Sequence, residues 1–258
     1  MSAKPEFWTG AHALAFDDPE VARLYRFRPV YPPETFDVLA GLVVGPRIAL
    51  DAGTGTGAIA RDLASRVDRV DAVDPAAAML AEARRLPNGN DPRIRWIHGP
   101  AETAPLRGPY GLITTGQSLH WMDWGTVLPR FATLLAPGAR LAIVDDPEDP
   151  QPWAAELLPI VQRYSILRGY HQFTLIDALV ERGLFVREAE IRTAPVPFSQ
   201  TVDEYISSFH ARSSLARHRI GDAATGAFDR ELRALLGDRT TVDRAVTGRI
   251  VYGRPVAP

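Results

Sequence analysis

A glycine-rich stretch and two acidic residues are the first features that could hold a ligand. The sequence "ALDAGTGTG", residues 49–57, ends an apolar run at Asp51 and continues with three alternating glycines. These are Gly53, Gly55 and Gly57. Glycines directly after a strand let the backbone approach a ligand closely, because no side chain stands between them. A second acid, Asp74, ends the next apolar run. With Ala58, the stretch also matches the dinucleotide fingerprint G-x-G-x-x-A, so the glycines alone leave NAD open as a ligand.

Composition excludes several other chemistries. None of the 258 residues is cysteine, so the chain lacks thiol nucleophiles, thiolate metal sites and disulfides. Lys4 is the only lysine and lies in the N-terminal stretch, which argues against a Schiff-base mechanism. Prolines interrupt the acidic run "VDDPEDP", residues 144–150, and we interpret it as a solvated loop rather than a magnesium site. Zinc-ligand spacing is also missing, so we expect no metal.

The elements that must position these residues alternate regularly over residues 47–146. Predicted strands cover residues 47–52, 69–75, 93–99, 110–116 and 139–146. Predicted helices cover residues 57–67, 76–86 and 127–138. Strands separated by helices form parallel βαβ units with right-handed crossovers. This part is therefore expected to be the ligand-binding core.

The regular alternation of predicted strands and helices ends after Asp146. Residues 152–183 are predicted to be helical, residues 185–198 to form a strand and residues 202–236 to be helical again. Residues 240–258 supply a last strand. We expect one domain over residues 1–258, in which the two helical insertions form a lid over the carboxyl edge of the sheet. Residues 1–46 are expected to be a helical segment that covers the cofactor.

The motifs together resemble the class I methyltransferases that use S-adenosylmethionine, in their small-molecule branch. The match rests on "DAGTGTG", on "VDP" at the end of the second strand, on "GPAETAPL" and on "LLAPGARL". Within that branch, "YRFRPVYP" and "QSLHWMDW" resemble the trans-aconitate methyltransferase-like group. The resemblance implies an α/β fold with a Rossmann-like, mostly parallel seven-stranded sheet and helices on both faces. The helical lid would be inserted after strand five and after strand six.

The resemblance also assigns parts of the cofactor to residues. Asp74 would accept hydrogen bonds from the ribose hydroxyls, and the glycine turn would approach the methionine part. Met79 would lie beside the adenine, with Ala101 or Glu102 near its amine. Tyr25, Arg28 and Tyr31 would close over the cofactor. The remaining expected cofactor contacts are Asp51, Thr54, Pro75, Gln117, Ser118 and His120.

Methyl transfer is an in-line displacement, so it needs alignment and exclusion of water more than it needs a base. His120 follows the fourth strand and is the candidate general base, because an unperturbed imidazole has a pKa near 6.5. A role as pocket wall stays open. Trp121, Tyr170, His171 and His210 are the expected substrate contacts.

The predicted reaction is transfer of a methyl group to a small-molecule acceptor, at an oxygen of a hydroxyl or carboxylate. A binding protein of the same fold without methyl transfer and an NAD-dependent oxidoreductase are the alternatives. The net charge of -2 argues against nucleic acid as a partner. Neither a signal-peptide core nor a membrane span is apparent, so we expect a cytoplasmic protein without membrane contact.

Overall fold

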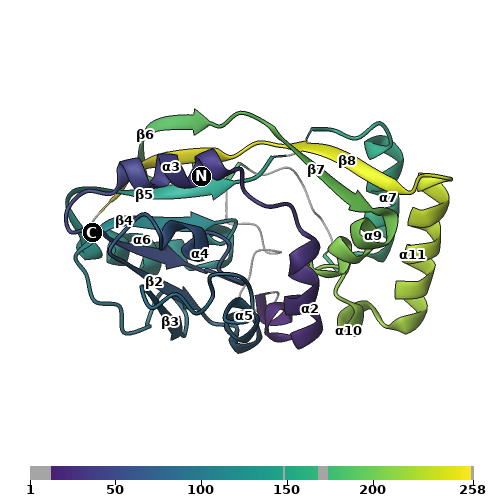
Figure 1. The fold of residues 1–258 in the computed structure, drawn as a ribbon, viewed down its shortest axis with the longest axis horizontal. Helices are drawn as coiled ribbons and strands as arrows, with labels where there is room; N and C mark the ends of the chain where they lie inside the picture. Colours follow the sequence, from purple (N-terminus) through teal and green to yellow (C-terminus); the bar gives the residue numbers. More distant parts are fainter. Residues whose placement is uncertain (1–12, 148, 168–173, 257–258) are drawn as a thin grey trace.

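One seven-stranded sheet forms the centre of the computed structural model, which describes residues 13–147, 149–167 and 174–256 (Figure 1). Its order is β3-β2-β1-β4-β5-β9-β6. The strands are β1 (Ile48–Ala52), β2 (Arg69–Asp74), β3 (Ile94–His98), β4 (Tyr110–Gly116), β5 (Leu135–Asp145), β6 (Phe185–Arg192) and β9 (Arg249–Pro255). Neighbours among β1 to β5 pair in parallel, whereas β9 runs antiparallel to both β5 and β6. The predicted mostly parallel seven-stranded sheet is confirmed.

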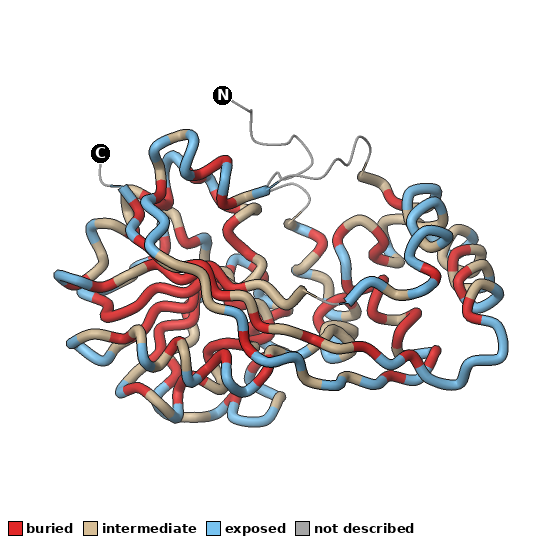
Figure 2. Tube along the Cα trace, turned by 90° about the horizontal axis from the view of Figure 1, so that it is seen from above, coloured by how far each residue is buried: buried red, intermediate tan, exposed pale blue. Residues whose placement is uncertain are grey.

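Helices cover both faces of this sheet, which explains why its inner strands are mostly apolar and buried. The helices are α3 (Pro33–Leu42), α4 (Ala60–Leu63), α5 (Ala77–Ala83), α6 (Trp124–Leu134) and α8 (Leu175–Glu181). Successive side chains of a strand point to opposite faces. Leu50 of β1 accordingly belongs to the core under α6 and α8, and Ala49 belongs to the core under α3 and α4. Figure 2 shows buried strands, in red, at the centre of the larger body.

The lid is a second, smaller body with its own core. It comprises α7 (Ala154–Tyr164), β7 (Val196–Thr201), α9 (Val202–His210), α10 (Arg217–Ile220), α11 (Asp222–Leu236) and β8 (Thr241–Val246). Helix α9 begins at a capping box in which Thr201 and Glu204 satisfy each other's backbone N–H groups. Phe209 of α9 packs against Phe228 of α11, with ring centroids 5.6 Å apart. Both rings are buried, in a hydrophobic cluster separate from the clusters of the main sheet.

Several predicted boundaries differ from the structure, among them the end of the helix expected over residues 127–138, because β5 already begins at Leu135. Residues 175–181 were expected in the lid, but α8 packs Ile176 and Leu179 into the core of the main sheet. The strand expected over residues 185–198 is divided into β6 and β7, and β7 pairs with β8 in a separate two-stranded ribbon. The C-terminal strand is divided in the same way into β8 and β9. Pro195 has no N–H group for a ladder, which accounts for the interruption after β6.

The N-terminal segment lies between the main sheet and the lid (Figure 1). It contains η1 (Leu14–Asp17), α2 (Pro19–Leu24) and η2 (Tyr25–Phe27). Asp18 caps α2 by accepting the N–H groups of Glu20 and Val21. Val21 and Ala22 pack in one cluster with Met79 of α5 and Ala216 of the lid. The segment therefore connects the two bodies.

None of the helices in the described part of the chain combines the length and the apolar character that a membrane crossing requires.

Candidate functional site

A cavity of about 1150 Å³ opens beside the carboxyl ends of β1, β2 and β4. Strands β2 and β3 lie on one side of β1, and β4 and β5 lie on the other, so the strand order reverses at β1. Open α/β sheets bind ligands at such a reversal. Pockets for one drug-sized ligand measure about 300–1,000 Å³, so this first cavity can hold a cofactor and part of a second molecule. Of the residues predicted to bind the cofactor, it is lined by Tyr25, Arg28, Tyr31, Asp51, Gly53, Thr54, Gly55, Asp74, Pro75, Met79, Ala101, Glu102, Gln117 and Ser118.

The glycine turn uses its three glycines for different purposes. All three have positive φ angles, of 67° at Gly53, 56° at Gly55 and 77° at Gly57. A Cβ at Gly53 would lie 2.4 Å from Cβ of Ser118, and a Cβ at Gly57 would lie 2.5 Å from the Trp96 ring. A Cβ at Gly55 would meet no protein atom within 4 Å. Gly53 and Gly57 are thus needed for packing, and only Gly55 leaves space that a ligand can use.

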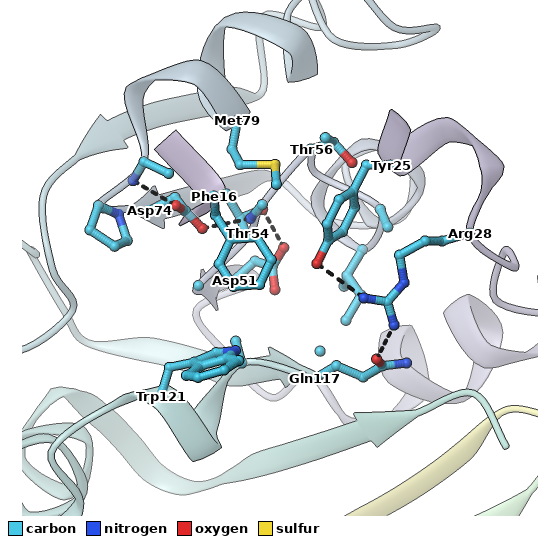
Figure 3. Close-up of a pocket in the computed structure, with 18 of the residues that line it drawn as sticks. Phe16, Tyr25, Arg28, Asp51, Thr54, Thr56, Asp74, Met79, Gln117 and Trp121 are labelled. Atoms are coloured by element: carbon cyan, nitrogen blue, oxygen red, sulfur yellow. Dashed lines mark hydrogen bonds between the residues drawn. The ribbon is translucent and has the colours of Figure 1, made fainter. Parts of the chain in front are cut away.

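Asp74 joins the end of β2 to the glycine turn. Its carboxylate accepts the N–H groups of Gly55 at 2.7 Å and of Ala76 at 2.8 Å (Figure 3). A carboxylate has about four acceptor positions, so two remain for a ligand. Burial raises the pKa of Asp74 to about 6 against the opposing effect of these two hydrogen bonds. Asp74 therefore offers a cavity-facing acceptor whose charge state changes near neutral pH.

Asp51 holds the glycine turn through hydrogen bonds to two threonines. It accepts hydrogen bonds from the hydroxyls of Thr54 at 2.5 Å and Thr114 at 2.9 Å. Burial raises its pKa to about 6 as well. Because the carboxylate connects β1, the turn and β4, it holds the turn in the shape that brings Gly55 to the cavity.

Residues 25–31, here called the strap, close the cavity from the N-terminal side. Arg28 donates to the Gln117 side chain at 2.7 Å and to the Tyr25 hydroxyl at 3.3 Å (Figure 3). Burial by itself would lower the pKa of Arg28. The electrostatic interactions with Tyr25 and Asp146 raise this pKa by more, so it lies above the ordinary value. Gln117 itself has a φ of 49°, a conformation that is uncommon for a side-chain-bearing residue and often marks a functional site. A permanent cation thus stands in the cavity.

The opposite end of the cavity is apolar. Met79 of α5 lines it, and Phe16 and Trp121 meet there edge to face with ring centroids 5.7 Å apart. Glu102 lies at the same rim and accepts the backbone N–H of Asp123 at 2.8 Å. Ser118 donates its hydroxyl to the carbonyl of Ala52 at 2.7 Å, so this side chain supports the wall. A flat apolar group with one polar edge would fit this end.

A second cavity of about 360 Å³ adjoins the first one. Gln117 and Asp146 line both cavities, and His120 lines the second. Arg249 of β9 and Asp145 also line the second cavity, and they form an ion pair with an N–O distance of 3.2 Å. In the described residues, histidine and acidic side chains form no cluster of three or more that could hold a metal ion. His120, predicted as a cofactor contact and candidate base, therefore lines the second cavity and not the first.

The structure corrects one predicted substrate contact, and two others lie outside the residues that it describes. His210 is completely buried in the lid, and its ring nitrogens lie 2.8 Å from the Leu215 carbonyl and 2.8 Å from Asp229. Its role is to connect α9 with α11, because the two ring nitrogens are already engaged, so the prediction of a substrate contact was wrong. Tyr170 and His171 lie outside the described residues. Trp121 lines the first cavity.

His210→Ala is expected to lower the melting temperature by several degrees and to leave cofactor affinity unchanged. Loss of a buried hydrogen-bonded side chain costs about 1–3 kcal/mol, and each kcal/mol shifts the melting temperature of a chain this size by about 2–4 °C. Thermal unfolding by circular dichroism and a cofactor titration measure the two quantities. His218→Ala, at a half-exposed histidine, is the control and should melt like the wild type. An unchanged melting temperature in His210→Ala would contradict the structural role.

Sequence reasoning did not find several residues that line the cavities. Phe16 carries no motif and reaches the cavity only because α2 packs on α5. Arg249 lies at the start of the last strand, and nothing local indicates that β9 inserts next to β5. Asp145 and Asp146 were assigned to a solvated loop, but they line the second cavity. Only the position of the two acids at the end of a predicted strand could have indicated this.

Comparison with protein families matches residues 49–138 to a methyltransferase domain. An uncharacterised methyltransferase of Mycobacterium tuberculosis is 36% identical over 140 residues, which are 54% of this chain and 55% of that protein. The chain thus spans about half the length of the mycobacterial relatives it matches. A trans-aconitate 2-methyltransferase of Methylobacterium radiotolerans is 35% identical over 186 residues, 69% of this chain and 65% of that protein.

Solved structures with the same fold include a proposed type II methyltransferase from Anaeromyxobacter dehalogenans. It is 25% identical, has a TM-score of 0.60 and is aligned over 90% of this chain and 99% of its own. A methyltransferase-like structure from Bacillus halodurans, with a TM-score of 0.54 and 17% identity, covers 86% of this chain and shares the fold.

Proposed function

Because this chain belongs to the class I S-adenosylmethionine-dependent methyltransferases, we propose that it methylates an oxygen atom of a small-molecule acceptor. The observation that carries the proposal is the junction of the two cavities at Gln117 and Asp146. It gives the cofactor and the acceptor adjoining compartments. The relative named for trans-aconitate, a carboxylic acid, supports oxygen as the accepting atom.

The residues of the first cavity fit the parts of S-adenosylmethionine. Asp74 has two acceptor positions for the ribose hydroxyls, and the free space at Gly55 admits the ligand against the backbone. The apolar end with Met79 suits the adenine ring, and Glu102 can accept from its amine. Arg28 suits the cofactor's carboxylate, since guanidinium binds carboxylates through paired hydrogen bonds. Bound there, the cofactor supplies a methyl group on a positively charged sulfur.

The protein's contribution to the reaction is alignment and shielding. The turn after β4 carries Gln117 to the junction, where its side chain is fixed by Arg28. Trp121 and the strap cover the first cavity, which limits access of water to the methyl group. His120 borders the acceptor compartment, where a neutral imidazole can accept the proton of a hydroxyl acceptor. A carboxylate acceptor needs no base, and there His120 acts as a wall.

The proposal is tested by incubating the protein with S-adenosylmethionine and a panel of carboxylic acids, alcohols, phenols and amines. Mass spectrometry follows S-adenosylhomocysteine and the methylated product. We expect product from an acid or a hydroxyl compound and a loss of turnover in Arg28→Ala. Product formed only from amines would contradict oxygen as the acceptor atom.

The pH dependence of cofactor affinity is expected to follow the charge of Asp74. Burial raises the pKa of this carboxyl to about 6, and only the ionised form accepts from both ribose hydroxyls. Protons therefore compete with the cofactor, and affinity should be full above that pKa and fall by about tenfold per pH unit well below it. Calorimetry with S-adenosylhomocysteine between about pH 5 and pH 8 measures this. Asp74→Asn, which does not titrate, is the control and should lose most of the slope; an equal slope in that variant would exclude Asp74 as its source.

A further inference from the structure

The β7–β8 ribbon of the lid touches the strap at Phe27, which lines neither cavity. Gln200 of β7 is 4% exposed, and its side-chain nitrogen donates to the carbonyl of Phe27 at 2.5 Å. The two residues are separated by 173 positions in the sequence. Gln200 lines neither cavity. Its contact is therefore with the backbone that carries the cavity residues and not with the cavity itself.

A buried arginine fixes the orientation of this glutamine. Arg244 of β8 is 8% exposed and donates from Nη2 to the side-chain oxygen of Gln200. Its guanidinium also lies 5.1 Å from the ring centroids of Phe198 and Tyr205. An arginine only donates and a carbonyl only accepts, so the amide of Gln200 has a single orientation that satisfies both neighbours. The lid thus presents a prealigned N–H group to the strap.

The accepting carbonyl belongs to the peptide unit that leads into Arg28. The carbonyl of Phe27 and the N–H of Arg28 share one rigid plane. Gln200 holds the carbonyl, and the carbonyl of Tyr25 accepts the N–H at 2.9 Å. Both polar groups of the plane are therefore fixed. Because the direction of the Arg28 side chain starts from this plane, its approach to Gln117 depends on the contact with the lid.

We propose that Gln200 and Arg244 are positioning residues that set cofactor affinity by holding Arg28 at the carboxylate end of the cofactor. The proposal rests on the function proposed above, in which Arg28 binds that carboxylate. A second contact between lid and N-terminal segment supports it, since Arg217 pairs with Glu20 at 2.8 Å and Ala216 packs in one cluster with Val21 and Ala22. The lid accordingly acts on the cofactor compartment through its contacts with the N-terminal segment.

The test compares two ligands that differ in the group Arg28 would bind. S-adenosylhomocysteine carries the amino acid part, and 5′-methylthioadenosine lacks it. Gln200→Glu keeps an acceptor for Arg244 but cannot donate to Phe27, because an ionised carboxylate only accepts. We expect Gln200→Glu to weaken S-adenosylhomocysteine binding by about tenfold. Binding of 5′-methylthioadenosine should stay unchanged, because this ligand lacks the carboxylate that Arg28 would bind. Arg244→Met should show the same selectivity.

A loss of affinity for S-adenosylhomocysteine alone distinguishes a positioning role of Gln200 from a general effect on folding, which would weaken both ligands. Ser199→Ala, at the exposed neighbour of Gln200 on the same strand, is the matched control and should bind both ligands like the wild type. In Arg28→Ala the added Gln200→Glu change should have no further effect, because the two act through one group. Equal affinity for S-adenosylhomocysteine in Gln200→Glu and wild type would overturn the proposal. If Gln200→Glu binds neither ligand, both ligands are titrated into Gln200→Met. Loss of affinity for both ligands in Gln200→Met would also overturn the proposal. A wild type that binds neither ligand would instead contradict the proposed function.

Discussion

Gly55→Val is expected to abolish measurable S-adenosylmethionine binding in a chain that still folds. A Cβ at this position meets no protein atom within 4 Å, so the valine side chain occupies space that the cofactor needs. The φ of 56° disfavours a branched residue, at a cost of about 1–2 kcal/mol. That is small beside the roughly 5–15 kcal/mol of a typical domain. The loss should therefore appear in binding and not in folding.

Calorimetry and circular dichroism on the same samples check this result. Gly53→Val is the matched control, because its Cβ would lie 2.4 Å from Cβ of Ser118. We expect Gly53→Val to lose both stability and binding, whereas Gly55→Val loses binding alone. Retained affinity in Gly55→Val would remove the glycine turn from the cofactor site.

Asp74→Ala is expected to weaken S-adenosylmethionine by about a hundredfold or more, because two hydrogen bonds to a charged acceptor are lost at about 1.5–3 kcal/mol each. The change also leaves the N–H groups of Gly55 and Ala76 without their acceptor, which loosens the turn. Titration calorimetry gives the affinities. Asp68→Ala, at the other end of the same strand region, is the control and should bind normally. Unchanged affinity in Asp74→Ala would contradict the assignment of the ribose site.

Much of the lining of the first cavity could be predicted because its residues lie next to strand ends. Asp51 and Asp74 lie at the ends of predicted strands and Gly53 follows the first of them, and parallel strands bring their carboxyl ends to one edge. Arg28 and Tyr31 were found through the resemblance of "YRFRPVYP" to related chains. Local sequence and known motifs thus sufficed for this part of the lining.

The lid could not be predicted at the same level, because its architecture depends on contacts between distant residues. The amphipathic pattern of residues 202–236 correctly indicated helices, but it gave no partner for His210, whose ring connects α9 to Asp229 of α11. The ribbon contact between Gln200 and Phe27 has no local signal. The pattern of α8 is also compatible with either core, and only the tertiary structure shows that Leu179 packs under the main sheet.

Titration of S-adenosylmethionine into the wild-type protein tests the central assignment most directly, with NADH as the competing ligand left open by the glycine fingerprint. Binding to the native state releases or absorbs heat in proportion to occupancy and raises the melting temperature by mass action. We expect saturable binding of one S-adenosylmethionine per chain and no saturable binding of NADH. Saturable binding of NADH without binding of S-adenosylmethionine would contradict the assignment.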